Sequence, residues 1–154
     1  MIDHVSLAVK NFEQSQAFYD QTLEILGYHP VMSFCHDGAH LAGYGKNGKP
    51  DFWISFSKKH ARPGETIGKA QGFHVAFLAP SVESIHAWHK KCLELGGQDN
   101  GAPGPRPQYY PGYYGGFIID PNGWRIEAAI HRGLNVQDGE QEGMPTSPLQ
   151  KTDR

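Results

Sequence analysis

The chain contains two copies of one unit, and this repeat limits the folds that it can adopt. A shift of 70 residues aligns the segment DHVSL at 3–7 with FHVAF at 73–77, and the alignment continues without a gap. Seven of the 24 positions from His4 to Gly27 are then identical, among them His4 with His74 and Gly27 with Gly97. A repeat of this kind predicts a pseudo-symmetric fold in which the two histidines occupy equivalent places.

The first unit has the pattern of a strand, a helix and three further strands. Alternating apolar residues predict a strand over 1–9, and Asn11 is the candidate N-cap of a helix that ends at Gly27. Three short strands are expected over 30–34, 40–44 and 51–57. The second unit repeats this order, with a strand over 72–79, a helix capped by Ser81 and a hairpin over 117–131. A Gly- and Pro-rich stretch at 100–107 carries no strand pattern.

These elements predict an α+β domain over residues 1–131. Two pseudo-symmetric β-α-β-β-β units, 1–57 and 72–131, are expected to form a curled mixed sheet, a cup with the helices outside, joined by a polar linker over 58–71. The segment 132–154 has almost no apolar content and is expected to be a flexible tail.

Composition excludes several classes of function. A formal net charge of −2 and the lack of basic runs argue against nucleic acid as a partner. No stretch approaches the roughly 20 apolar residues that a membrane span needs, and the chain starts in a strand without the pattern of a signal peptide. We therefore expect a cytoplasmic protein. Cys35 and Cys92 are isolated from each other, which favours reduced structural thiols.

The residues resemble a known family at both ends of the repeat. The opening DHV at 3–5, a helix that ends in LGY at 26–28 and the closing phrase FIIDPNGWRIE at 117–127 are similar to the vicinal oxygen chelate superfamily. This superfamily includes glyoxalase I, extradiol dioxygenases, fosfomycin-resistance thiol transferases and bleomycin-binding proteins. The resemblance implies the fold strongly and the reaction weakly, since one fold hosts many activities.

The resemblance also implies a metal site. The family's metal ligands map onto His4, His74 and Glu127, and Glu127 is also the candidate catalytic residue. Two imidazoles and one carboxylate suit one divalent ion such as Mn, Fe, Ni or Zn and leave positions open for water and substrate. Small residues beside the three side chains leave volume for a ligand. One such histidine alone is more often structural, but two at equivalent positions with a matching glutamate favour a metal site.

Departures from the subfamily patterns reduce the number of reactions that the resemblance supports. Glyoxalase I has a fourth ligand in the last strand of the first unit, where this chain has only Asp51 at the beginning of the segment 51–57. Ordinary four-ligand glyoxalase I chemistry is therefore disfavoured. The signature residues of extradiol dioxygenases and the phosphonate loop of the fosfomycin type are not recognisable either.

An aromatic run indicates where a substrate would bind. Candidate pocket residues are Trp53, Tyr109, Tyr113, Tyr114 and Arg125. Tyrosines offer apolar contact with a polar end, but they are equally common in cores and at subunit interfaces. Arg125 could hold a substrate anion or lie solvated at the edge of its strand. His131 is a further pocket candidate, because it lies four residues after Glu127 on an extended strand.

Two classes of function remain open. In the first, the protein is a glyoxalase-like metalloenzyme, a metal-dependent lyase, dioxygenase or thiol transferase, whose ion binds adjacent oxygens of a small molecule. In the second, it is a metal-independent binder of an antibiotic-type small molecule. The three candidate ligands favour the first. A homodimer is also expected, as in small proteins of this superfamily, and the linker over 58–71 would allow two chains to exchange units.

Overall fold

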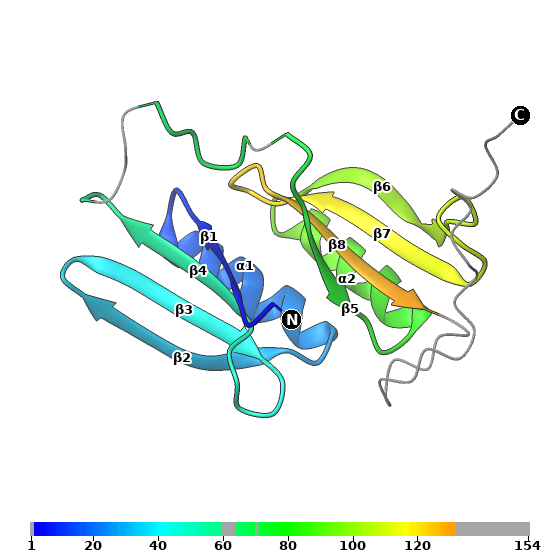
Figure 1. The fold of residues 1–154 in the computed structure, drawn as a ribbon, viewed down its shortest axis with the longest axis horizontal. Helices are drawn as coiled ribbons and strands as arrows, with labels where there is room; N and C mark the ends of the chain where they lie inside the picture. The colour runs from blue at the N-terminus through cyan, green and yellow to red at the C-terminus, as the bar shows by residue number, and fades with distance from the viewer. Residues whose placement is uncertain (1, 60–63, 70, 132–154) are drawn as a thin grey trace, which may run out of the picture.

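A computed structural model describes residues 2–59, 64–69 and 71–131, and its elements repeat in the predicted order (Figure 1). The first unit comprises β1 (Val5–Ala8), α1 (Phe12–Ile25), β2 (His29–His36), β3 (Ala39–Gly45) and β4 (Phe52–Ser57). The second comprises β5 (Val75–Leu78), α2 (Val82–Glu94), β6 (Gln98–Pro105), β7 (Tyr113–Ile119) and β8 (Arg125–His131). The expected tail at 132–154 lies outside the described residues.

Each unit forms one mixed four-stranded sheet. The strand orders are β1-β4-β3-β2 and β5-β8-β7-β6, so the two sheets have the same topology. The first strand pairs in parallel with the last in both units, with Val5 opposite Phe52 and Val75 opposite Ile126, and the remaining pairs are antiparallel. The predicted α+β fold of two pseudo-symmetric units is confirmed.

Both helices begin at the residues that the sequence indicates. The side chain of Asn11 accepts a hydrogen bond of 2.8 Å from the backbone N–H of Gln14. Ser81 accepts one of 3.1 Å from the N–H of Ser84, whose hydroxyl oxygen in turn accepts from the N–H of Ser81. These contacts satisfy N–H groups that a helix leaves unpaired at its first turn.

The Gly- and Pro-rich stretch is a strand, which the sequence pattern did not predict. Residues 98–105 form β6 at the edge of the second sheet, paired only with β7. The pairing register shifts twice, between Asp99 and Gly101 and between Gly101 and Gly104. An edge position and bulges tolerate proline and glycine, because one side of the strand needs no ladder hydrogen bonds.

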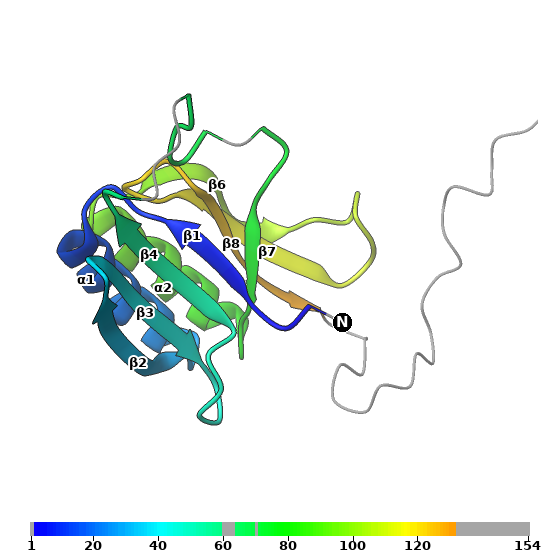
Figure 2. The ribbon, with the colours of Figure 1, turned by 60° about the vertical axis from the view of Figure 1, so that its left-hand side comes forward.

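The two helices lie on the same side of the sheets and contact each other (Figures 1 and 2). A single cluster of buried residues from both units fills the space between helices and sheets. The rings of Tyr19 and Phe52 lie 5.0 Å apart, and Phe52 contacts Phe77 of the second unit at the same centroid distance. The units therefore share one core, and the opposite face of each sheet is left open.

A buried polar network also joins the units at the turn between β7 and β8. Asp120 and Asn122 are each 3% exposed. The hydroxyl of Tyr19 donates to Asp120 at 2.8 Å, and the backbone N–H of Lys10 donates to Asn122 at 2.8 Å. The DPNG turn of the second unit is thus anchored to α1 of the first.

The edge strands β1 and β5 run in opposite directions (Figure 1). The end of β1 lies beside the start of the second unit's strands, since the indole N–H of Trp124 donates to the carbonyl of Ala8 at 2.7 Å. The hydroxyl of Tyr28 contacts the backbone of Leu78 at the end of β5, on the side where Phe52 and Phe77 meet. Since Phe52 is paired with Val5, the start of β1 lies near the end of β5.

Among the described residues, no helix combines the length and the apolar character required to cross a bilayer.

Candidate functional site

Glu127 is a buried carboxylate on the open face of the second sheet. It lies on β8 between Ile126 and Ala128, whose side chains face the core, and it is 2% exposed. The hydroxyl of Tyr113 donates to its Oε1 at 2.5 Å, and Nε2 of His74 lies 3.2 Å from its Oε2. Within the described residues, no lysine or arginine forms an ion pair with it. Burial of a carboxylate is costly unless a cation or hydrogen-bond donors compensate.

A glycine makes room for this carboxylate. A Cβ atom built on Gly115 of β7 would lie 2.8 Å from Oε1 of Glu127 and 3.2 Å from Cε1 of Tyr113. Any side chain at this position would therefore displace the Glu127 carboxylate or the ring that holds it. Sequence reasoning missed Gly115, because its role depends on a neighbouring strand that the sequence does not place.

An aromatic cluster surrounds the hydroxyl that holds Glu127. The ring of Tyr113 meets those of Tyr109, Tyr110 and His131 edge to face, with centroids 5.0–5.5 Å apart. The hydroxyl of Tyr110 is hydrogen-bonded to Nδ1 of His131. Burial, followed by the hydrogen bond to Glu127, raises the pKa of Tyr113 well above its usual range. Tyr113 therefore stays protonated and continues to donate.

His4 lies apart from His74 and Glu127. It precedes β1, its side chain is 56% exposed, and its Nδ1 lies 2.7 Å from Oδ1 of Asp3. Because β1 and β5 run in opposite directions, His4 and His74 are at opposite ends of strands that are four residues long. Four extended residues span about 13 Å. In the described part of one chain, no three His, Cys, Asp or Glu side chains come close enough to hold an ion.

The predicted pocket residues divide between three places. Tyr109 and Tyr113 lie together beside Glu127, and Arg125 lies on the same strand as Glu127. Trp53 lies on the open face of the first sheet, where the centroids of its ring and the Phe34 ring are 6.2 Å apart. Tyr114 packs against the core, and its hydroxyl is 2.7 Å from Nε2 of His86 on α2. Tyr114 therefore lies on the opposite face of β7 from Tyr113, because neighbouring residues of a strand face opposite sides.

Comparison with known proteins agrees with this architecture. A family model described as the glyoxalase/bleomycin resistance protein/dioxygenase superfamily matches residues 1–128. The chain belongs to this superfamily. A search of the curated proteins finds no match to this chain.

Solved structures of the same superfamily are similar over most of the chain. A glyoxalase/bleomycin resistance protein from Albidiferax ferrireducens T118 is 25% identical, with a TM-score of 0.66, over 84% of this chain and 98% of that one. A putative glyoxalase from Bacillus halodurans is 26% identical, with a TM-score of 0.55, over 84% and 95%. Glyoxalase I from Zea mays is 21% identical, with a TM-score of 0.64, over 83% of this chain and 45% of the maize chain. The chain thus spans less than half of the length of the maize enzyme. At 21% identity, the similarity to that enzyme shows a shared fold alone.

This superfamily member has no carboxylate within β4. Asp51 precedes that strand, and its carboxylate pairs with Nζ of Lys49 at 2.6 Å. The same Lys49 ammonium contacts Asp3, next to His4. Asp51 is therefore engaged at the surface, and the last strand of the first unit offers Phe, Trp, Ile and Ser in place of a fourth ligand.

The open face of the first sheet is a wide apolar groove. It has a volume of about 1020 Å³ and is lined by the apolar residues Phe34 and Leu41, by small residues of β1 and by the linker residue Ile67. Its edge strand β2 exposes Met32 to 47% and Phe34 to 44%. On the second sheet, Leu78 is 41% exposed. In one chain, apolar side chains of both sheets are thus left in contact with solvent.

Proposed function

We propose that the protein binds one divalent ion per chain, of the Mn, Fe, Ni or Zn type, and acts on a small molecule that offers it two adjacent oxygens. The single observation that supports this most is the burial of Glu127 beside His74, without a lysine or arginine partner in the described residues. A carboxylate oxygen and an imidazole nitrogen are ligands that such ions accept.

We further propose that a second copy of the chain completes the site with its His4. The two ligands of one chain lie on the open face of the second sheet, and His4 lies at the first sheet. Pairing the first sheet of one copy with the second sheet of another would cover the exposed Met32, Phe34 and Leu78. Such pairing in a twofold-symmetric homodimer produces two equivalent sites.

In the proposed reaction, residues of the chain hold the ion, fix the Glu127 carboxylate and support the substrate. A bound ion of this kind supplies Lewis acidity toward the adjacent oxygens of a substrate. Glu127 and His74 would hold it, and Glu127 is also the candidate catalytic residue because it is the buried carboxylate at this position. Tyr113 fixes one carboxylate oxygen of Glu127 through its hydroxyl. The rings of Tyr109 and Tyr110 give apolar walls on which a small molecule can rest.

The reaction class stays open between a metal-dependent lyase, a dioxygenase and a thiol transferase. A second candidate function is metal-independent sequestration of a small molecule, supported by the apolar groove of about 1020 Å³ on the first sheet. We place the protein in the cytoplasm, in line with two cysteines that are both free thiols.

Metal analysis of the purified protein tests the ligand set. We expect about one ion per chain in the parent, and loss of at least 90% of it in His74→Ala. His29→Ala is the matched control, because His29 is an exposed histidine on β2 at the far edge of the first sheet. Full occupancy that survives His74→Ala would exclude His74 as a ligand. A parent without metal that still binds an aromatic compound would favour the binder.

A mixing experiment tests the shared site. His4→Ala and His74→Ala chains are each expected to lack metal on their own. If the site is shared, mixed dimers formed after denaturation and refolding together contain one intact site each, so about a quarter of all sites regain metal. If both histidines serve the same chain, the mixture stays without metal, and the shared site is wrong.

A further inference from the structure

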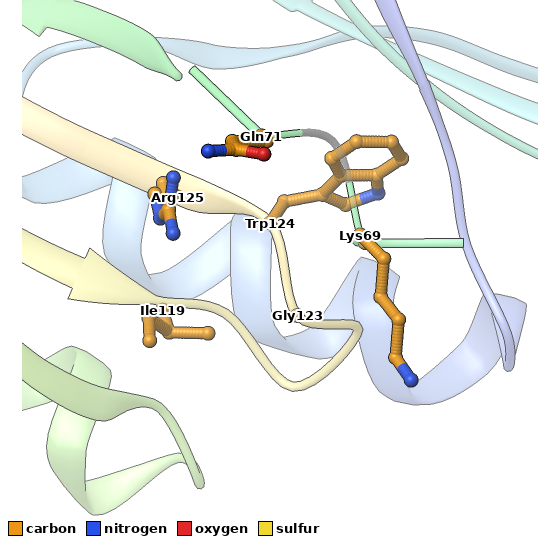
Figure 3. A pocket seen from close by; sticks show the side chains of 7 residues that line it. Lys69, Gln71, Ile119, Gly123, Trp124 and Arg125 are labelled. Atoms are coloured by element: carbon orange, nitrogen blue, oxygen red, sulfur yellow. The ribbon is translucent and has the colours of Figure 1, made fainter. Parts of the chain in front are cut away.

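A second, smaller pocket lies where the linker meets the hairpin of β7 and β8 (Figure 3). Its volume is about 290 Å³, and it is lined by Gly68, Lys69, Gln71, Ile119, Gly123, Trp124 and Arg125. Two of these side chains, Lys69 and Arg125, are cationic, and none is acidic. The lining therefore has a formal charge of +2 in a pocket that also offers the carboxamide of Gln71.

The cations of this pocket lack partners in the described residues. No ion pair or hydrogen bond occupies the guanidinium of Arg125 or the ammonium of Lys69 there, whereas Lys49, Lys59 and Lys91 each pair with a carboxylate. Figure 3 shows Arg125 and Gln71 on one side of the Trp124 ring, whereas the side chain of Lys69 begins below the ring and points away from both. Arg125 and Gln71 thus present donors to the same space.

The walls of the pocket are built on close backbone packing. A Cβ atom on Gly68 would lie 2.2 Å from the carbonyl oxygen of Asn122, and one on Gly123 would lie 3.0 Å from that of Gly68. The linker is therefore pressed directly against the hairpin turn. Trp124 is held by its hydrogen bond to Ala8 and by edge contact with the ring of Phe73 at 6.0 Å. These contacts hold the walls of the pocket together, and ligand pockets are usually largely formed before the ligand binds.

The pocket adjoins the proposed metal ligands. Arg125 and Glu127 are alternate residues of β8 and face the same side of the sheet, with Cα atoms about 7 Å apart in an extended strand. The parallel register of β5 and β8 begins with Val75 opposite Ile126, and His74 and Arg125 are the residues that precede this pair. The cationic pocket and the His74–Glu127 pair are therefore consecutive along one open face.

We propose that this pocket binds an oxyanion, a carboxylate or phosphate, carried by the substrate. The planar guanidinium of Arg125 can donate two parallel hydrogen bonds to such a group, and Gln71 can donate a third. The placement of this group relative to the reacting oxygens rests on the proposed function. The substrate is then a small molecule with two adjacent oxygens at one end and an anionic group several ångströms away.

Binding of the anion alone is tested in metal-free protein, so its outcome does not depend on the metal site. Inorganic phosphate and malonate are titrated at constant ionic strength while the indole N–H signals of the three tryptophans are followed by NMR. Trp124 lines the pocket, Trp88 is buried in the core, and Trp124→Phe assigns the signal. We expect saturable movement of the Trp124 signal with at least one probe, and the two titrations distinguish phosphate from carboxylate.

Two matched variants test whether this pocket binds the phosphate or malonate probe. Arg125→Gln should weaken the binding of the probe at least tenfold, whereas Lys90→Gln removes the same charge from the exposed side of α2 and should leave it unchanged. Equal effects of the two variants, or no saturable shift in the parent with either probe, would overturn the anion pocket.

A second pair of probes tests the link to the metal ligands. In metal-loaded protein, 2-oxoglutarate and 2-oxopentanoate offer the same adjacent oxygens and chain length, and only the first carries a distal carboxylate. We expect 2-oxoglutarate to bind at least tenfold more tightly, with the preference lost in Arg125→Gln. Equal binding of the two probes would show that an anion in the pocket does not assist chelation. Absence of metal from the parent would instead reject the proposed function and leave the metal-free test standing.

Discussion

The hydroxyl of Tyr113 lies 2.5 Å from Oε1 of Glu127, and it holds a carboxylate that is almost fully removed from solvent. The contact joins neighbouring strands, since Tyr113 belongs to β7 and Glu127 to β8. Hydrogen bonds of this kind orient carboxylates for metal binding.

Removal of this hydroxyl should weaken metal binding. Tyr113→Phe keeps the ring and its aromatic neighbours but leaves Oε1 of Glu127 without its donor. We expect a loss of about 10- to 100-fold in metal affinity, measured by competition with a chelator. Tyr109→Phe is the control, because the Tyr109 ring contacts Tyr113 but is 53% exposed. A metal affinity of Tyr113→Phe equal to that of Tyr109→Phe would contradict the positioning role.

A single methyl group should distinguish the two faces of β7. Gly115→Ala places Cβ 2.8 Å from the Glu127 carboxylate, whereas Gly116→Ala places it 3.1 Å from Pro103 and 3.3 Å from Ile85 on the helix side. Both variants should lower the free energy of unfolding, by about 1–3 kcal/mol. Only Gly115→Ala should also lower metal affinity. Similar affinities in both variants, measured by the same competition assay, would mean that Gly115 does not set the position of Glu127.

The buried network at the β7–β8 turn should contribute strongly to stability. Asp120 accepts hydrogen bonds from Tyr19, from the backbone and side chain of Asn122 and from the backbone of Trp124. Asp120→Asn turns one acceptor oxygen into a donor that faces other donors, and we expect a loss of about 2–3 kcal/mol in urea unfolding. Asp37→Asn is the control, because Asp37 forms an exposed ion pair with Lys59, and it should cost less than about 1 kcal/mol. A cost for Asp120→Asn as small as that of the control would contradict the network's role.

Stability should fall in alkaline solution because of Tyr19. Burial, and then the neighbouring Asp120 carboxylate, raise the pKa of Tyr19 well above the value of 10.0 for an exposed tyrosine. Below pH 10 the residue is protonated in both states and the free energy of unfolding does not depend on it. Above pH 10 the unfolded chain releases this proton while the folded protein retains it, so stability decreases by about 1.4 kcal/mol per pH unit from this group.

Urea unfolding between pH 8 and 11 measures this effect. Tyr19→Phe removes the group that titrates, so its stability should depend less steeply on pH above 10, although it is less stable at neutral pH. Identical slopes in Tyr19→Phe and the parent would assign the alkaline loss to other groups.

Much of the fold could be predicted because its signals are local. Alternation of apolar residues, the N-caps Asn11 and Ser81 and the glycines that end the helices each act within a few residues. The repeat added the equivalence of the two units. Residues 98–105 escaped prediction because their strand depends on pairing with β7, which overrides the low strand propensity of glycine and proline.

The candidate site also has features that local sequence signals predict and features that depend on strand pairing. The repeat and the family resemblance led to the prediction that His74 and Glu127 hold one ion, and strand alternation predicted that Arg125 lies on the side of Glu127. In the structure the side chains of His74 and Glu127 are 3.2 Å apart. Only the tertiary structure decided that Tyr113 and Gly115 frame the carboxylate, that Tyr114 turns into the core and that His4 lies apart. Periodicity assigns a side chain to a face of its own strand, but which strands become neighbours, and in which direction, is set by the packing of the two units around their shared core.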